Sequence, residues 1–269
     1  MTHTSHIKLR LRNHDAVSHW RLTEHNRYAI VIAATVRESE QDAVAAHALE
    51  RPTSTTMAPK LNLFLAPGAC SLAPHILLRE AGLPYTTTTI SYSTGFLPEY
   101  LKLNPKGKVP FMQMDDAVIT ETPAIMTAIA QLAPTKHFLG KTNLETVRCY
   151  EWMNWLSGTL HGQAFGGLFR PERFVTDAAL VGAVSEKARE TIAGCYAFIE
   201  ERLQGKTWAV GEDFSAVDAY LFVFWRWGNM KGFEMREKYP EYTALVERVA
   251  EREKVRETVE EEGVGMWGT

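Results

Sequence analysis

Cysteine is scarce in this sequence, and its few cysteines form no recognisable pattern. Only Cys70, Cys149 and Cys195 occur among the 269 residues. An odd number with no closely spaced pair argues against a disulfide framework and favours a reducing compartment over secretion. Long hydrophobic runs are also missing, since the longest, residues 28–36, is too short to cross a bilayer and too deep in the chain for an ordinary signal peptide. We therefore expect neither a secreted protein nor a membrane protein.

An excess of positive charge is likewise absent. The formal net charge is −3, which gives no reason to expect a nucleic-acid partner. Six of the nine histidines lie before residue 57, but their spacing matches no metal site, so we expect no metal. What remains is typical of a globular protein, with 45% hydrophobic and 23% charged residues in a chain long enough for one large domain or two small ones.

Residues 1–58 differ in composition from the rest, and we expect them to form a flexible N-terminal extension. Residues 51–56, where Pro52 is followed by a run of threonine and serine, have the composition of a linker, and Met57 comes directly after them. Basic residues precede the first acidic residue, Asp15, as in a weak mitochondrial presequence. The expected location is cytoplasmic, or mitochondrial if this extension acts as a presequence.

Residues 59–134 have the pattern of a small α/β domain. Apolar and β-branched runs predict strands over 61–65, 86–90, 109–114 and 117–120, the last two joined by a hairpin turn at Asp115-Asp116. Apolar residues at helical spacing predict a helix over 71–81, ended by Gly82, and a second helix begins at Thr122-Pro123. This order of elements predicts a mixed sheet with helices packed on it.

Residues 142–262 are expected to form a second, all-helical domain. Apolar residues at helical spacing predict long helices over 144–169 and 178–203, and shorter helices over 240–250 and 254–262. The last of these is highly charged and is expected on the surface. Between them, Ser215-Ala216-Val217-Asp218 resembles a capping box with aspartate in place of glutamate, and the helix after it is apolar nearly all round. Ser215 and Asp218 are therefore expected to be a structural cap at the start of a buried helix.

Cys70 lies where the first helix begins, after a Pro67-Gly68 turn. A thiol at a helix N-terminus faces free backbone N–H groups and the positive end of the helix dipole, so we expect a lowered pKa and a reactive thiol. The alternative is a small buried cysteine in a strand–helix turn. Cys149 and Cys195 lie among apolar residues within helices, where burial raises a thiol pKa, and we expect them to be inert.

Four motifs in a fixed order resemble the glutathione S-transferase family. The stretches 66–72 (Ala-Pro-Gly-Ala-Cys-Ser-Leu), 104–110 (Asn-Pro-Lys-Gly-Lys-Val-Pro) and 121–125 (Glu-Thr-Pro-Ala-Ile) resemble the glutathione-binding half of that family, and the box at 215–218 resembles its folding motif. The Cys-Ser pair and Leu160-His161, followed by Phe169-Arg170-Pro171, look most like the bacterial beta-type class. The resemblance implies a thioredoxin-like first domain, an all-α second domain, glutathione as substrate and a homodimer.

The resemblance also implies a set of site residues. Cys70 and Ser71 are both candidates for the group that faces the glutathione sulfur, since a hydroxyl there lowers the pKa of the thiol by hydrogen bonding and a thiol there can form a mixed disulfide. If the Val109-Pro110 peptide is cis, the Val109 backbone can pair with glutathione as an added strand; otherwise it is an ordinary entry into a strand. Glu121 offers a charge for the α-ammonium group. Thr122 offers the N-terminus of a helix for the γ-glutamyl carboxylate, or merely caps that helix.

The second domain is expected to complete the site. Asn154 and His161 are two helical turns apart on one face and match glutathione-contacting positions of the beta-type class. A pocket for a small electrophile or a mixed disulfide is expected near Phe165, Phe169 and Trp225.

The sequence departs from the beta-type pattern in two places. Gly162 replaces a lysine usual in that class, and the basic residue expected to meet the glycyl carboxylate is missing, unless Lys106 or Lys108 takes its place. These departures favour a rival interpretation, a non-catalytic binding or assembly module on the same fold. The motifs together favour a glutathione transferase that conjugates small electrophiles or reduces mixed disulfides.

Overall fold

A computed structural model describes residues 58–91 and 95–268. The expectations for the N-terminal extension lie outside the described residues, apart from residue 58. Strands and helices alternate in the first part of the chain: β1 (Leu61–Leu65), α2 (Leu72–Ala81), β2 (Thr86–Thr89), α3 (Pro98–Leu103), β3 (Phe111–Met114), β4 (Ala117–Thr120) and α4 (Thr122–Leu132).

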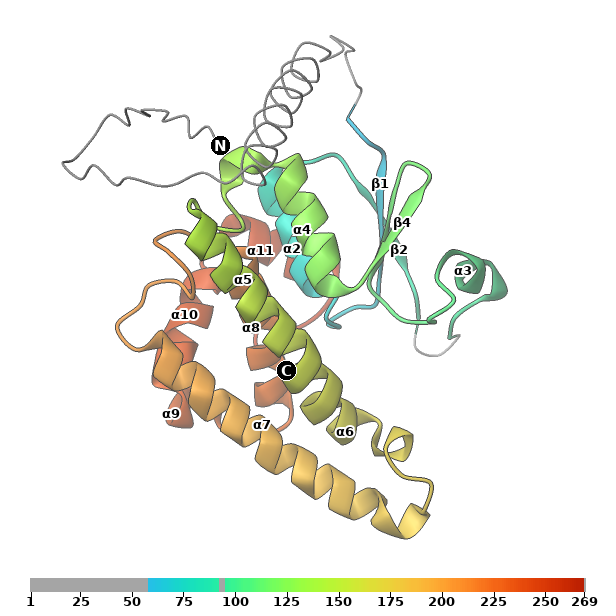
Figure 1. The fold of residues 1–269 in the computed structure, drawn as a ribbon, viewed down its shortest axis with the longest axis vertical. Coiled ribbons are helices and arrows are strands. Elements are labelled where there is room, and N and C mark those ends of the chain that lie inside the picture. The colour runs from blue at the N-terminus through green and yellow to red at the C-terminus, as the bar shows by residue number, and fades with distance from the viewer. Residues whose placement is uncertain (1–57, 92–94, 269) are drawn as a thin grey trace, which may run out of the picture. The chain divides into compact units, whose positions relative to one another are not determined.

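The four strands form one mixed sheet in the order β2-β1-β3-β4. β1 pairs with β2 in parallel and with β3 antiparallel, and β3 and β4 form the expected hairpin. The helices α2 and α4 lie side by side against one face of the sheet (Figure 1). This arrangement confirms the thioredoxin-like α/β first part.

Successive side chains of β1 point to opposite faces of the sheet, and both faces are apolar. Leu63 and Leu65 face the core shared with α2 and α4, whereas Phe64 stacks on Phe111 of β3 at 4.0 Å in a separate cluster on the other face. Tyr100 of α3 packs edge-on against Phe64. Because successive side chains of a strand point to opposite faces, this one short strand holds both layers together.

Everything after the sheet is helical. The longer helices are α5 (Asn143–Trp155), α7 (Val181–Leu203), α8 (Ala216–Met230), α10 (Pro240–Ala250) and α11 (Glu253–Glu261). The shorter helical segments are η1 (Pro134–Lys136), η2 (Leu156–Phe165), α6 (Gly166–Phe169), η3 (Pro171–Arg173), η4 (Ala178–Leu180) and α9 (Met235–Lys238). The all-α second part is therefore confirmed. In the part of the chain that the structure describes, no helix is long and apolar enough to cross a membrane.

The long helix expected over 144–169 changes its winding midway. α5 is an α-helix as far as Trp155, η2 is π-helical over Leu156–Phe165, and α6 returns to α-helical winding. The wider i→i+5 turns of a π-helix rotate successive side chains differently from α-helical turns. The faces predicted from α-helical spacing therefore do not hold beyond residue 155.

Helix α8 is the centre of the helical part. Its residues from Ala216 to Gly228 are all buried, as a sequence that is apolar nearly all round predicts. At its start, the Asp218 carboxylate accepts hydrogen bonds from the backbone N–H of Ser215 (2.8 Å), the Ser215 hydroxyl (2.7 Å) and the backbone N–H of Ala209 (2.9 Å). The carboxylate thus joins the preceding loop to the first turn of the helix.

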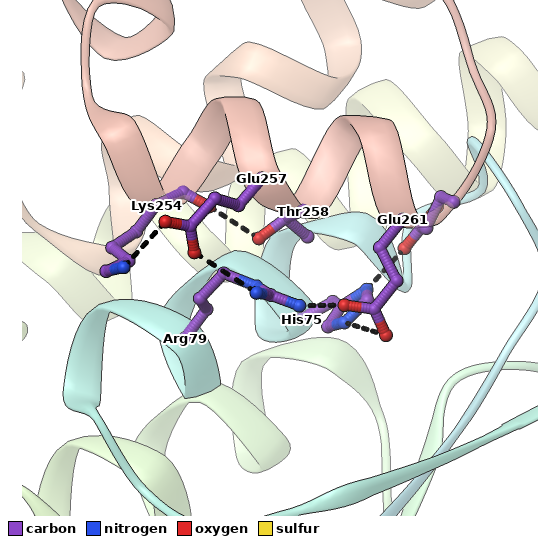
Figure 2. A network of polar contacts seen from close by, with 7 residues as sticks. His75, Arg79, Lys254, Glu257, Thr258 and Glu261 are labelled. Atoms are coloured by element: carbon purple, nitrogen blue, oxygen red, sulfur yellow. Dashed lines mark hydrogen bonds and ion pairs between the residues drawn. The ribbon is translucent and has the colours of Figure 1, made fainter.

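Helix α11 is less exposed than its charge suggests. One face of the helix is buried, and the helix packs on α2. The residues of this face are Val255, Thr258 and Val259. Figure 2 shows Glu257 and Glu261 of α11 reaching the Arg79 side chain of α2. The helix therefore lies on the surface as expected, with its charged side exposed and one narrow apolar stripe against the rest of the molecule.

Candidate active site

A cavity of about 1300 Å³ lies where the sheet part meets the helical part. The predicted site residues that line it are Cys70, Val109, Pro110, Glu121, Thr122, His161 and Phe169. Ser71, Asn154, Phe165 and Trp225 do not line it. Most of the predicted constellation is therefore gathered around one space, and four of its members lie elsewhere.

Ser71 is turned away from the cavity and braces the turn between β1 and α2. It is fully buried, and its hydroxyl both donates to the Ala66 carbonyl oxygen (3.1 Å) and accepts from the Ala66 N–H (3.2 Å). These two bonds satisfy both backbone polar groups of Ala66 and use the one hydroxyl proton, so none is left to donate to a ligand sulfur. Of the two candidates for that position, the geometry supports Cys70.

Cys70 lines the cavity with a thiol that is 5% exposed. Its Sγ donates to the Val109 carbonyl oxygen at 3.6 Å. Burial raises the pKa of the Cys70 thiol to about 11, although the Thr122 hydroxyl and nearby backbone N–H groups lower it. The expected lowering of this pKa is wrong, because the loss of hydration at the helix start outweighs the helix dipole.

The other two thiols behave as expected. Burial raises the pKa of Cys149 to about 12 and that of Cys195 to about 11. Neither lines the cavity. The pKa values therefore do not distinguish Cys70 from the other cysteines, whereas its position does.

The loop before β3 presents backbone groups to the cavity. The Val109-Pro110 peptide is cis. The buried Asn104 side chain shapes this loop, since its amide donates to the Lys108 carbonyl oxygen at 2.8 Å and its oxygen accepts from the Lys106 N–H at 3.2 Å. The sequence pattern included Asn104 in a motif but assigned it no role.

Glu121 and Thr122 form the start of α4. Glu121, not Thr122, is the N-cap residue, and its φ of 72° is a conformation that non-glycine residues rarely adopt. Its carboxylate is exposed and pairs with Lys106 Nζ at 2.6 Å. Thr122 is the first helical residue, so its N–H belongs to the free N-terminal set of the helix.

Asn154 and His161 do not share a face. Asn154 lines a smaller neighbouring pocket of about 450 Å³ together with Glu121 and Tyr150, whereas His161 lines the large cavity. The π-helical winding of η2 separates them, because seven residues no longer complete two turns. The two pockets share Glu121 and Ser157, and contact of Asn154 with glutathione stays a prediction.

His161 packs among aromatic rings and is neutral. Its ring centroid lies 5.1 Å from that of Trp227 and 5.8 Å from that of Phe224. Burial, together with the positive charge of Lys108, lowers the pKa of His161 to about 4, while Glu121 acts in the opposite direction. At neutral pH the imidazole can donate or accept a hydrogen bond but carries no charge.

The expected electrophile pocket is only partly supported. Phe169 lines the cavity, but Phe165 is fully buried beneath it, stacked on Phe169 at 5.2 Å. Trp225 points into the core on the other side of α8, where its Nε1 donates to the Thr243 hydroxyl at 3.0 Å. Trp227, two residues further on, lines the cavity instead. Because α8 is apolar on every side, its sequence could not indicate which tryptophan faces the site.

The C-terminal segment forms a wall that the sequence did not predict. Gly263, Val264, Gly265 and Gly268 line the cavity. The buried Arg226 guanidinium donates to the Gly265 carbonyl oxygen at 2.7 Å and to that of Met266 at 3.1 Å. These bonds hold the segment against α8.

Gly68, at the turn before Cys70, is held from both sides. The Glu262 carboxylate accepts from its N–H at 2.8 Å, and Trp227 Nε1 donates to its carbonyl oxygen at 2.9 Å. The same Glu262 side chain contacts His75 Nδ1 at 2.8 Å. The thiol-bearing turn is therefore fixed by the end of α11 and by α8.

Tyr220 is a further residue that sequence reasoning missed. Its side chain is fully buried. Burial and the neighbouring Cys70 raise the pKa of Tyr220, whereas the Ser157 and Thr122 hydroxyls lower it. A buried tyrosine hydroxyl thus lies near Cys70 and the start of α4. In the described part of the chain, no cluster of side chains could hold a metal ion.

Comparison with known proteins agrees with this geometry. The family models "Glutathione S-transferase, N-terminal domain" and "Glutathione S-transferase, C-terminal domain" match residues 68–132 and 173–253. Glutathione S-transferase GstA of Escherichia coli O157:H7 is 34% identical over 214 residues, which are 76% of this chain and 100% of that protein.

Two solved structures are similar at the level of the fold as well. A glutathione transferase homologue from sulfitobacter with bound glutathione has a TM-score of 0.72 at 30% identity, over 77% of this chain and 99% of that one. A bacterial beta class glutathione S-transferase of Sphingomonas chungbukensis has a TM-score of 0.66 at 32% identity, over 75% of this chain and 98% of that one. The chain belongs to the glutathione S-transferase family.

Proposed function

We propose that this enzyme transfers glutathione to small electrophiles, with glutathione bound along residues 59–134 and the electrophile facing residues 142–262. One observation carries the proposal: Cys70, the Val109 backbone, the N-terminus of α4 and His161 all line a single cavity. These are the groups needed to hold an extended peptide with a thiol at its centre. Such a reaction would serve detoxification.

The Val109 backbone is the anchor for the cysteinyl part of glutathione. A ligand strand laid along it would donate its N–H to the Val109 carbonyl oxygen, which now accepts from Cys70. At the other end, the free N–H groups of α4 near Thr122 suit the γ-glutamyl carboxylate, and the exposed Glu121 suits the ammonium group. Lys106 is paired with Glu121, whereas Lys108, which also lines the cavity, is available for the glycyl carboxylate.

Cys70 acts in this proposal as a hydrogen-bond donor. Because its pKa is about 11, its thiol stays protonated at neutral pH and can donate to a glutathione thiolate. A donor at that place favours the charged form of the ligand and lowers the pKa of its thiol. The reduction of mixed disulfides is less well supported, since a thiol of high pKa is a poor nucleophile at neutral pH.

The test separates binding from turnover. Retention on immobilised glutathione should be followed by steady-state assays with glutathione and a neutral chlorodinitrobenzene. The proposal predicts both retention and saturable turnover. Retention without turnover would support the rival, a non-catalytic binding module, and failure of both would overturn the assignment of the cavity to glutathione.

Two finer points belong to the same proposal. The protein is a homodimer, and exposed apolar side chains on α5, Leu144 at 66% and Val147 at 61%, support an interface there. The protein works in the cytoplasm, where reduced glutathione is abundant and where its three free cysteines stay reduced.

A further inference from the structure

The wall of the large cavity is strongly positive, although the whole chain carries a formal net charge of −3. Among the described residues that line it, Glu121 is the one carboxylate, and it is paired with Lys106. The basic residues that line it are Lys106, Lys108, Arg170, Arg173 and Arg226. A cavity that gathers charges of one sign raises the local concentration of ligands of the opposite sign.

Glutathione accounts for only part of this charge. In the proposed pose its glycyl carboxylate meets Lys108, its γ-glutamyl carboxylate meets the start of α4, and Lys106 is paired with Glu121. Arg226 is buried and already donates to the carbonyl oxygens of the C-terminal segment. Arg170 and Arg173 are therefore the two basic residues of the cavity wall that glutathione does not contact in this pose.

Arg170 and Arg173 lie together beyond the aromatic wall. Arg170 follows directly on α6, and Arg173 ends η3 three residues later. Both side chains are exposed, and neither is paired with a carboxylate of residues 58–91 or 95–268; Glu172, between them, makes no ion pair with them. Unpaired guanidinium groups with planar donor faces are suited to bidentate contact with a carboxylate.

The surface next to these arginines is apolar and aromatic. Phe169 packs edge-on against Trp227 with 5.3 Å between ring centroids, and both line the cavity. A third cation, Lys231 Nζ, lies 5.0 Å from the Phe169 centroid. The wall thus combines a surface for a flat apolar group with positive charge at its edge.

We propose that the second substrate of this enzyme is an anionic electrophile, with an apolar or aromatic body against Phe169 and Trp227 and a carboxylate held by Arg170 and Arg173. The inference rests on the proposed transferase function and names its substrate class. In the reaction, the glutathione thiolate attacks the electrophilic carbon and a carbon–sulfur bond forms from the sulfur electron pair. Where the electrophile is an aryl halide, the carbon–halogen bond breaks and the halide leaves with its electron pair. The proton of the glutathione thiol has already passed to solvent.

Two electrophiles with the same reacting carbon test the proposal. A neutral chlorodinitrobenzene and the corresponding chlorodinitrobenzoate differ by one carboxylate, and the ratio of their kcat/KM values can be compared between proteins without regard to their intrinsic reactivities. The R170Q/R173Q variant should lower kcat/KM for the benzoate about tenfold, the size of a single charge-assisted contact, and leave the value for the neutral compound within about twofold.

The matched control removes two positive charges elsewhere. Lys102 and Lys206 are exposed and do not line the cavity, so K102Q/K206Q should leave the ratio unchanged. Added salt should lower kcat/KM of the wild type for the benzoate more than for the neutral compound, because screening acts on exposed charges.

The outcomes separate the two proposals. A ratio that R170Q/R173Q leaves unchanged, or an equal loss with both electrophiles, would overturn the inference about the anion while leaving the transferase function intact. An equal shift of the ratio in the control variant would show that net charge, not these two arginines, is responsible, and would also overturn it. No turnover of either electrophile by the wild type would overturn the transferase function itself.

Discussion

The position of Cys70 favours a reactive thiol, whereas its burial disfavours one. It lies at a helix start and in a cavity, yet burial raises its pKa to about 11. A helix terminus stabilises a thiolate by at most about 2 kcal/mol, which is about 1.5 pKa units. Desolvation of a buried charge can shift a pKa by about 3–5 units in the opposite direction. The residue is therefore placed for contact with a ligand sulfur and poorly suited to act alone as a nucleophile.

The first prediction concerns the alkylation rate of Cys70 in the ligand-free protein. Since only the thiolate reacts, the rate with iodoacetamide should rise about tenfold per pH unit from pH 7 to about pH 10. Peptide mapping by mass spectrometry identifies the modified residue, and the C70S variant gives the background. A rate that levels off below pH 8 would mean that the thiol pKa is lowered after all.

His161 leads to a prediction about acid stability. Its pKa is about 4 in the folded protein against about 6.5 in an unfolded chain. A depressed folded-state pKa contributes stability that is present above pH 6.5 and is lost as the pH falls toward 4. The wild type should therefore lose on the order of 2–3 kcal/mol of unfolding free energy relative to H161Q between pH 7 and pH 4.

Urea unfolding of both proteins at several pH values measures this difference. Because other groups titrate equally in the two proteins, the difference isolates His161. A constant difference across this range would contradict the assignment of a buried neutral imidazole.

Among the elements, the sheet and most helices could be predicted from sequence. β1 and the hairpin of β3 and β4 have short apolar runs bounded by turn residues, and α10 begins at Pro240 and ends at Ala250 as its apolar spacing indicates. Local patterns of this kind need no knowledge of distant contacts.

Other features depend on tertiary contacts and could not be predicted. Asn154 and His161 line different, adjoining pockets, and no residue signals the π-helical winding of η2 that lies between them. In α8, buried on all sides, Trp225 and Trp227 are equivalent by sequence and differ only in what packs against them. The C-terminal wall depends on Arg226 and Glu262, whose partners lie far away in the chain.

The capping box at the start of α8 leads to a prediction about the stability of the fold. The D218A variant leaves three donors without an acceptor, the N–H groups of Ala209 and Ser215 and the Ser215 hydroxyl. It should lower the free energy of unfolding by about 2–4 kcal/mol. The D213A variant, which loses only an exposed pair with Lys141, should change it by less than about 0.5 kcal/mol.

Chemical denaturation of the two variants makes the comparison. Folded D218A should retain turnover per molecule, since Asp218 does not line the cavity. Similar losses for both variants would show that the box adds little to the helix start.

For the whole molecule, the proposed homodimer depends on the apolar side chains that α5 exposes. Sedimentation of the wild type at micromolar concentration should give about twice the chain mass. Introducing two like charges at the exposed Leu144 and Val147, as L144E/V147E, should give the monomer mass, because buried unpaired charges are unfavourable in an interface. A monomeric wild type, or a variant that stays dimeric, would contradict an interface at α5.

The central claim is that the cavity binds glutathione and stabilises its thiolate with the help of Cys70. The most direct measurement is the pKa of the bound glutathione thiol, from the ultraviolet difference absorbance of the thiolate as a function of pH. Cys70, with a pKa of about 11, does not interfere below pH 9. The account predicts that the pKa of bound glutathione lies at least about one unit below the value of about 8.5 for a free thiol, that C70S retains most of this shift and that C70A loses much of it. Bound glutathione with an unshifted pKa, or the same shift in C70A, would contradict the account.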